Sequence, residues 1–107
     1  MKRFNVIFAA SAQIEIAESF EWGRKYWGEQ AAKNWYRTLK RSVRKSLSDM
    51  PLAWPIAPEN TIYAAEIRQM FVGRYRVIFS VEKRTVRILH VRNAFVDSTQ
   101  RPFEEDE

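Results

Sequence analysis

Two adjacent apolar stretches joined by a polar turn most constrain how this chain can fold. Residues 75–81 (YRVIFSV) carry apolar side chains at every second position, with Ile78 between these, and in 86–92 (VRILHVR) the apolar side chains are Val86, Ile88, Leu89 and Val91. Such alternation predicts two strands, joined by the tight turn Glu82-Lys83-Arg84. The near-continuous apolar content indicates burial on both faces. We therefore expect these strands at the middle of a sheet that another layer covers.

Two helices are expected to supply that layer. A short apolar strand over residues 4–8 precedes a helix over 12–27, with Ser11 as the expected N-cap. A second helix is expected over 29–50, where apolar residues recur every three or four positions: Ala32, Trp35, Leu39, Val43, Leu47 and Met50. Pro51 ends it, because proline lacks the amide donor and clashes with a continuing turn. The short connection at Gly28 predicts an antiparallel helical hairpin.

The segment between the hairpin and the central strands contains three prolines within residues 51–61 (PLAWPIAPENT). We expect a rigid, extended loop that Leu52, Trp54 and Ile56 attach to the core. Alternation then predicts a strand over residues 63–68. The resulting order is β-α-α-β-β-β, an α+β fold in which an antiparallel sheet packs on the helical hairpin. Residues 1–103 are expected to form one domain, followed by an acidic tail at 104–107.

Composition narrows the chemistry. Among 107 residues there is no Cys and only one His, which excludes disulfides and thiolate chemistry and predicts neither a metal site nor a cofactor. The start MKRFNVIFAASAQ is too short and interrupted for a secretory signal, and no apolar run is long enough to cross a membrane, so a cytoplasmic protein is expected. The net charge is +5, although the tail alone holds four of the 13 acids. A basic body of this kind fits a polyanionic partner or simply a solvated surface.

Arginines inside the predicted strands are the strongest candidates for function. Arg68, Arg76 and Arg92 occupy positions where a sheet ordinarily favours apolar or β-branched residues. If the three guanidinium groups converge, they form a site for phosphate. The alternative is a solvated sheet face, or pairing with a carboxylate such as that of Glu66. His90 is the candidate general acid or base, although a lone strand histidine is more often a structural residue.

Two further surfaces are candidates for binding. The second helix carries a cationic face that could meet phosphates or an acidic protein, with Arg37, Arg41, Arg44 and Lys45 as its main members. The hairpin is rich in aromatic residues: Trp22, Tyr26, Trp27, Trp35 and Tyr36. These rings could stack on bases, but their spacing favours the seam and core of the hairpin.

The chain resembles the RelE/ParE superfamily, the toxin components of type II toxin–antitoxin systems. The resemblance covers nearly the whole chain and includes the aromatic-rich hairpin over residues 20–47 and the ending L-x-x-x-P at 47–51. Its most specific part is the succession Glu66-Ile67-Arg68, YRVIF at 75–79 and VRILHVR at 86–92. These strings are similar to the sheet signature of the superfamily.

The resemblance implies one of two activities. RelE-like members cleave mRNA at the ribosome without a metal, and Arg76, Arg92 and Arg68 match basic positions of that site, with His90 as a possible acid or base. ParE-like members inhibit DNA gyrase. RelE-like toxins usually carry lysines where residues 63–66 read YAAE, and a Tyr or His where 93–96 read NAFV. These departures favour the ParE-like branch, while leaving open whether the chain is an enzyme.

The resemblance also implies a partner. Antitoxins of these systems are acidic and wrap the hairpin and sheet of the toxin, and Trp22, Tyr26, Trp35 and Leu39 are the residues expected to bind one. The implied biological roles are growth inhibition and plasmid stabilisation, through a toxin–antitoxin hetero-oligomer that targets gyrase or the ribosome. A basic binding module that keeps the fold without toxicity is the third interpretation.

Overall fold

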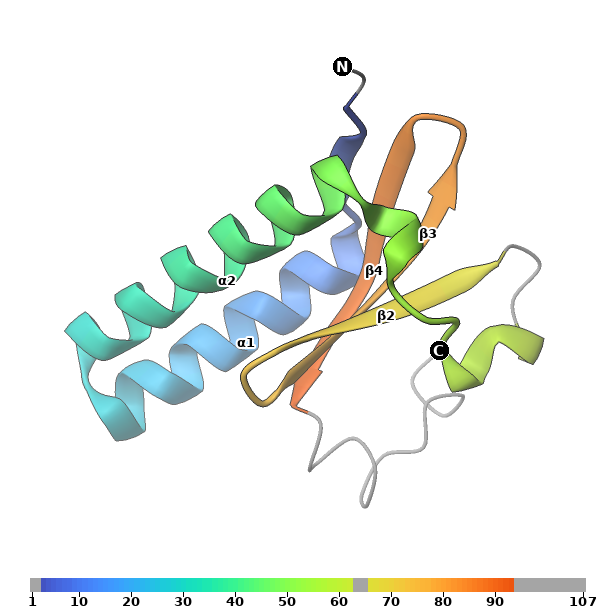
Figure 1. The fold of residues 1–107 in the computed structure, drawn as a ribbon. Coiled ribbons are helices and arrows are strands. Elements are labelled where there is room, and N and C mark those ends of the chain that lie inside the picture. Colours follow the sequence, from blue (N-terminus) through green and yellow to red (C-terminus); the bar gives the residue numbers. More distant parts are fainter. Residues whose placement is uncertain (1–2, 63–65, 94–107) are drawn as a thin grey trace.

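The computed structural model describes residues 3–62 and 66–93 (Figure 1). The strands are β1 (Asn5–Phe8), β2 (Ile67–Val72), β3 (Tyr75–Glu82) and β4 (Thr85–Asn93). The helices are α1 (Ala10–Trp27) and α2 (Glu29–Asp49), followed by two short 3₁₀ helices, η1 (Pro51–Ala53) and η2 (Pro58–Ile62). This order confirms the predicted α+β class. The acidic tail at 104–107 lies outside the described residues.

The four strands form one sheet in the order β1-β4-β3-β2. Strands β2, β3 and β4 make the antiparallel meander that the sequence predicts, and β3 and β4 are its central strands. Strand β1 adds to the edge of β4 in parallel, with Val6 opposite Val86 and Phe8 opposite Ile88. That parallel edge was not part of the prediction. It arises because α1 and α2 carry the chain away before it returns to the sheet.

The main core lies between the hairpin and one face of the sheet, as Figure 1 shows. Helix α2 buries Leu39, Val43 and Leu47, each with no exposed surface, on the stripe that the sequence predicts. The sheet contributes side chains from every strand to the same core: Val6, Phe8, Met70, Tyr75, Val77, Phe79, Val86, Ile88 and Val91. The opposite face carries a smaller cluster of Ala57, Ile67 and Ile78. The two central strands are therefore buried on both faces, as expected.

The beginning of α1 differs from the prediction. The helix starts at Ala10, its N-cap Ala9 makes no capping bond, and Ser11 is inside the first turn. The Ser11 hydroxyl instead donates to the Leu89 carbonyl over 2.6 Å. Strand β1 stops opposite Ile88, so the β4 backbone beyond that point needs other partners. Ser11 supplies one of them, which explains why it does not cap the helix.

The loop after α2 also differs. It contains the 3₁₀ helices η1 and η2, and two of its expected anchors, Leu52 and Ile56, are exposed. Pro51 and Ala57 are buried in their place, while Trp54 packs against the core as predicted. Ala57 is buried because the chain between η1 and η2 pairs with β2: the Ala57 amide donates to the Ile67 carbonyl over 2.9 Å, and the Gln69 amide donates to the Pro55 carbonyl over 3.0 Å.

The strand that follows this loop is shifted along the chain. The sequence predicts it over 63–68, whereas β2 spans Ile67–Val72 and turns at Gly73, whose φ is +59°. Positions 63–65 of the prediction lie outside the described residues. The pairing of β2 with β3 matters for function because it sets the face of the sheet that Arg68 occupies.

Candidate functional site

Two of the three strand arginines lie side by side. Arg76 on β3 is the direct cross-strand partner of Arg92 on β4, and His90 pairs with Ile78 two residues along. Because Val77 and Val91 face the helical core, Arg76 and Arg92 share the other face of the sheet. The register thus brings together two arginines and a histidine from sequence positions that the alternation had already singled out.

Arg68 does not join them. It is opposite Phe79 in the ladder, which places it on the face toward the helices. Its guanidinium donates to the Trp54 carbonyl over 2.6 Å and pairs with Glu66 over 3.0 Å. The three arginines therefore do not converge, and the alternative of pairing with Glu66 describes Arg68. Its position shows a structural role in holding the η1 loop against β2.

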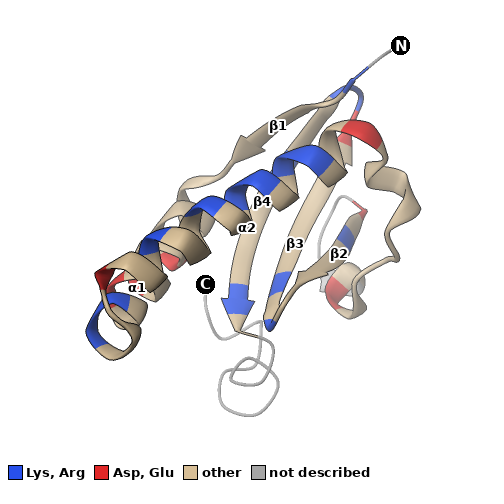
Figure 2. Ribbon diagram, turned by 60° about the vertical axis from the view of Figure 1, so that its left-hand side comes forward, with Lys and Arg blue, Asp and Glu red and all other residues tan. Residues whose placement is uncertain are grey.

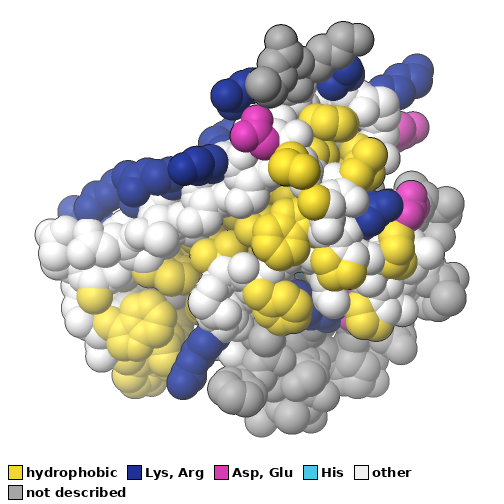
Figure 3. All heavy atoms as spheres, viewed as in Figure 1, with side chains coloured by type: hydrophobic (Ala, Val, Ile, Leu, Met, Phe, Trp, Pro, Cys, Tyr) yellow, Lys and Arg dark blue, Asp and Glu magenta, His cyan; other side chains and the backbone are white. Residues whose placement is uncertain are grey.

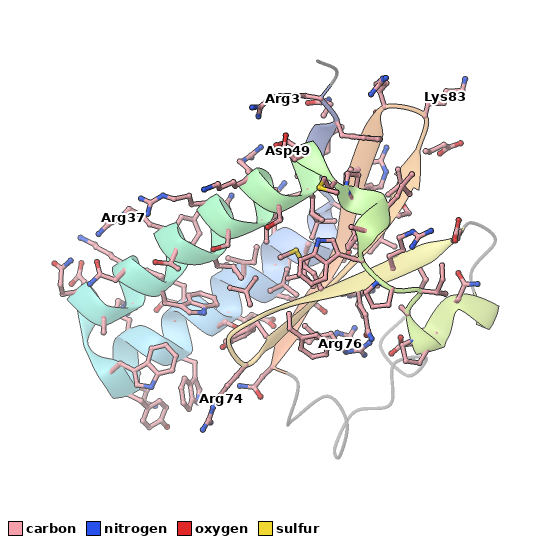
Figure 4. The ribbon with its side chains drawn as sticks, in the orientation of Figure 1. Arg3, Arg37, Asp49, Arg74, Arg76 and Lys83 are labelled. Carbon is pink, nitrogen blue, oxygen red and sulfur yellow. The ribbon has the colours of Figure 1, made fainter. Side chains whose placement is uncertain are left out.

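Arg76 is held by a carboxylate from η2. Its two terminal nitrogens donate to the two oxygens of Glu59 over 3.0 and 2.5 Å, and Nη1 also donates to the Gln69 side chain over 2.9 Å. The side chains of Arg76 and Glu59 are only 12% and 15% exposed. Figure 4 shows Arg76 at the sheet, on the side where η2 lies. A bidentate pair of this kind neutralises the guanidinium and fixes its plane.

Arg92 is held by a carboxylate from α1. Its Nε donates to Glu15 Oε2 over 2.9 Å, while the Val91 amide donates to Glu15 Oε1 over 2.9 Å. Glu15 lies one helical turn after Ser11, so the two side chains together bind the part of the β4 edge that β1 leaves uncovered. Sequence reasoning missed Glu15. The only available signal was its i+4 spacing from Ser11, which says nothing about the distant strand.

His90 lies next to both members of this pair. Its Nδ1 is 3.0 Å from Glu15 Oε2 and 3.2 Å from Arg92 Nη2. A proton on Nδ1 allows donation to Glu15, whereas an unprotonated Nδ1 accepts from Arg92. One ring nitrogen cannot do both, so these two states exclude each other. The cluster can therefore hold or release a proton at His90 Nδ1.

The chemistry of this face follows from the pairing. Each arginine already binds a carboxylate, so a phosphate would have to compete with Glu59 or Glu15 for the same donors. Within the described ranges, no group of three His, Asp or Glu side chains is arranged to hold a metal ion. On this face Arg76 and Arg92 are therefore members of mostly buried ion pairs and not exposed cations.

The cationic face of α2 presents the opposite situation. Arg37, Arg41, Arg44 and Lys45 are all exposed. Figure 2 shows Lys and Arg positions in blue on successive turns of α2. Arg37 donates to the Asn34 side chain over 2.7 Å, and Arg44 donates to the Val6 carbonyl over 3.3 Å. Among the described residues, none of these four cations has a carboxylate partner at ion-pair distance. Their charge is therefore available to a ligand.

The aromatic residues of the hairpin divide into two groups. Trp22 and Tyr26 are 52% and 61% exposed and contact each other with ring centroids 4.8 Å apart, and Trp27 is 5.3 Å from Trp22. The expectation that the hairpin aromatics form seam and core is wrong for these three. They gather at the α1 end of the hairpin because Gly23 lets the Trp27 ring fold onto the helix: a Cβ there would be 2.8 Å from the ring. Tyr36 is partly exposed but packs on Phe20 of α1 at 5.9 Å, in the seam between the helices.

The other two expected antitoxin contacts face inward. Trp35 is half-buried and packs on Tyr75 at 5.0 Å. Leu39 has no exposed surface, so its inclusion in a binding surface is wrong. It belongs to the core stripe of α2 because it lies four positions before Val43 and eight before Leu47, on the buried face of the helix. Of the predicted set, Trp22 and Tyr26 remain as surface residues.

Comparisons with known proteins bear on the fold. No protein-family model matches the sequence, and no curated protein matches it. A chain of the solved chromosomal ParDE TA system from P. aeruginosa superposes with a TM-score of 0.71 at 13% identity, covering 84% of this chain and 95% of that chain. The fold is therefore ParE-like, which confirms the resemblance at the level of architecture. Neither helix in the described parts of the chain is long and apolar enough to cross a membrane.

Proposed function

We propose that this protein is the toxin of a type II toxin–antitoxin pair and acts in the cytoplasm by binding a macromolecular target, with DNA gyrase as the favoured target. The supporting fold is one that a chain of a ParDE TA system shares over most of its length. The observation that carries the choice of target is the pairing of the sheet arginines with Glu59 and Glu15. A phosphate-cleaving site requires such donors to meet the substrate.

The antitoxin surface in this proposal is the exposed aromatic cluster of Trp22, Tyr26 and Trp27. Aromatic side chains that are exposed and close-packed are typical anchors of protein interfaces. The basic body of the protein, which holds 18 Lys and Arg, would speed encounter with an acidic antitoxin. Trp35 packs on Tyr75 and Leu39 is fully buried in the core, so this surface does not include them.

Induced expression tests the toxin assignment, and a gyrase assay tests the target. Expression of the chain alone should arrest growth, and co-expression of the small acidic protein encoded beside it should restore growth. Purified protein should then inhibit supercoiling by gyrase or raise the level of cleaved DNA. Unimpaired growth at high expression would favour a non-toxic binding module. Growth arrest without any effect on gyrase, even at excess toxin, would reject the proposed target alone.

A ribosome-dependent endoribonuclease is the second candidate, and the His90–Glu15–Arg92 cluster favours it. His90 Nδ1 lies 3.2 Å from the Arg92 guanidinium and 3.0 Å from the Glu15 carboxylate, which places an imidazole beside a cation as an acid–base site for RNA cleavage requires. Primer extension on translated mRNA would then reveal cuts that His90→Gln or Arg92→Lys abolishes while the protein stays folded. A wild-type protein that leaves translated mRNA intact would reject this candidate.

A further inference from the structure

The outer face of α2 carries a row of cations to which the proposed function assigns no contact with target or antitoxin. We call it the α2 ridge and define it as Arg37, Lys40, Arg41, Arg44 and Lys45. Figure 3 shows it as an unbroken dark blue row along the helix, separate from the apolar surface of the hairpin. The carboxylates of α2 are confined to its two ends, Glu29 and Asp49, so the ridge itself contains no opposing charge.

The residues between the cations indicate what kind of partner fits. The large apolar side chains from 37 to 48, Leu39, Val43 and Leu47, are fully buried, so the ridge exposes no apolar side chain between its cations. The exposed ring of α2 beside it is Tyr36, 5.3 Å from Lys40 Nζ. Protein interfaces take most of their affinity from apolar anchors. The ridge instead interleaves its cations with the hydroxyl groups of Thr38 and Ser42. Lysine, arginine and hydroxyl side chains are the groups that contact the phosphates of nucleic acids.

Two cations of the ridge are held in place before any ligand arrives. Lys40 Nζ is 4.5 Å from the centre of the Phe8 ring, and the Arg44 guanidinium is 5.2 Å from the same ring. Arg44 also donates to the Val6 carbonyl at the outer edge of β1. These contacts fix the direction of the two side chains, which lowers the entropy lost on binding. Arg41 and Lys45, which are exposed, are able to adjust to the ligand.

The dimensions of the ridge match a double-stranded backbone. Arg37, Arg41 and Arg44 follow one line along the helix, and the stretch from Arg37 to Lys45 is about 12 Å long. A duplex presents one phosphate per strand about every 3.4 Å along its axis, so the ridge covers about three or four successive phosphates. A single strand would instead require several exposed rings on which successive bases stack, and α2 exposes one ring beside the ridge, Tyr36, while Trp22, Tyr26 and Trp27 belong to α1.

We infer that the α2 ridge binds the phosphate backbone of double-stranded nucleic acid without reading the base sequence. This inference goes beyond the proposed function and does not depend on it, since it involves neither the aromatic cluster nor the sheet arginines. The shared chemistry is that of phosphodiesters in a duplex, and DNA and RNA are the two possible sources.

Fluorescence anisotropy with labelled 20-base-pair DNA and RNA duplexes tests the inference. The ridge variant is Arg41→Gln/Lys45→Gln, and the matched control is Arg24→Gln/Lys25→Gln, which removes the same charge from exposed positions of α1. At low salt we expect the ridge variant to lose at least tenfold in affinity and the control to stay within twofold. The slope of log affinity against log salt should be about −4 for the unchanged protein and less steep by about 2 in the ridge variant.

Comparison of the DNA and RNA duplexes with other polyanions identifies the ligand. Binding to either duplex supports the inference, and the stronger of the two identifies the source. Equal losses in both variants would overturn it, because the effect would then follow net charge and not the ridge. It would also fail if oligothymidylate binds as tightly as the duplexes, or if poly-glutamate of equal charge competes as well as unlabelled duplex. Unchanged circular dichroism and melting temperature keep a loss of folding from imitating a loss of binding.

Discussion

The sheet arginines and the α2 ridge contain the same kind of side chain in two opposite situations. Arg76 and Arg92 are 12% and 9% exposed, and each is bound by a carboxylate from another element. The ridge cations are mostly exposed, and in the described parts of the chain they contact carbonyl, amide and ring groups instead of carboxylates. Buried guanidinium groups need partners and so contribute to the fold. The exposed ones keep their charge for a ligand.

The largest effect should follow from removing the carboxylate that binds Arg92. Glu15→Ala leaves a buried guanidinium and the Val91 amide without this partner, so we expect the free energy of unfolding to fall by about 3 kcal/mol. Urea denaturation measures it. Glu18→Ala, at an exposed position of the same helix, should change stability by less than about 0.5 kcal/mol. If both variants behave alike, Arg92 is not held as the structure indicates.

A direct comparison of one arginine from each set comes next. Arg76→Ala removes the partner of Glu59 and should cost about 2 kcal/mol, because that carboxylate is mostly buried. Arg41→Ala should cost less than about 0.5 kcal/mol, since an exposed cation contributes little to folding. Thermal and urea unfolding of the two variants, side by side, check the difference. Equal stability would contradict the division of roles between sheet and ridge.

The hairpin that carries the ridge turns at Gly28. A substitution at this corner should lower the free energy of unfolding more than a substitution of a ridge cation does. Gly28 joins α1 to α2 at φ 101° and ψ 159°, a conformation that only glycine adopts readily. Gly28→Ala should therefore lower stability by about 1–2 kcal/mol. Its affinity for a duplex should stay within twofold of the original, because the ridge begins two turns later. A large loss of affinity would mean that the ridge depends on the corner.

The smallest expected change in the free energy of unfolding distinguishes ridge cations that contact a ring from those that do not. Lys40→Gln removes the contact of an ammonium group with the Phe8 ring and should cost about 0.5 kcal/mol of stability. Lys45→Gln should leave the free energy of unfolding unchanged within error. Both variants should weaken duplex binding. A chemical-denaturation series with tight replicates is needed, and equal midpoints would show that the ring contact contributes nothing.

Much of the architecture was predictable because its signals are local. The period-two pattern of residues 75–92 marks the central strands, and the spacing of Leu39, Val43 and Leu47 marks the buried stripe of α2. The conformation of the loop after α2 was harder to predict from the sequence. Leu52 and Ile56 are exposed while Pro51 and Ala57 are buried, Ala57 because its backbone pairs with β2. Hydrophobicity alone does not reveal such a reversal.

The candidate site depended on contacts between distant parts of the chain. The strand arginines and His90 could be singled out from their types and positions, but their partners could not: Glu15 is 77 residues from Arg92, and Glu59 is 17 from Arg76. The face that Arg68 occupies was known only from the pairing of β2 with β3, in which Arg68 lies opposite Phe79. Strand β2 itself starts later than the sequence predicts. Nothing in the sequence around Trp22 and Tyr26 separates an exposed cluster from a helical seam.

The order of residues was enough to establish an α+β chain with a basic helix and arginines in its central strands. Each of those features follows from a side-chain period of two residues in a strand or three to four in a helix, which the sequence shows directly. The folded chain alone paired the sheet arginines with Glu15 and Glu59, whereas the outward direction of the α2 cations already follows from the apolar stripe on the other side of that helix. Electrostatic partners are set by distance in space, and that distance exists only once the helices pack on the sheet.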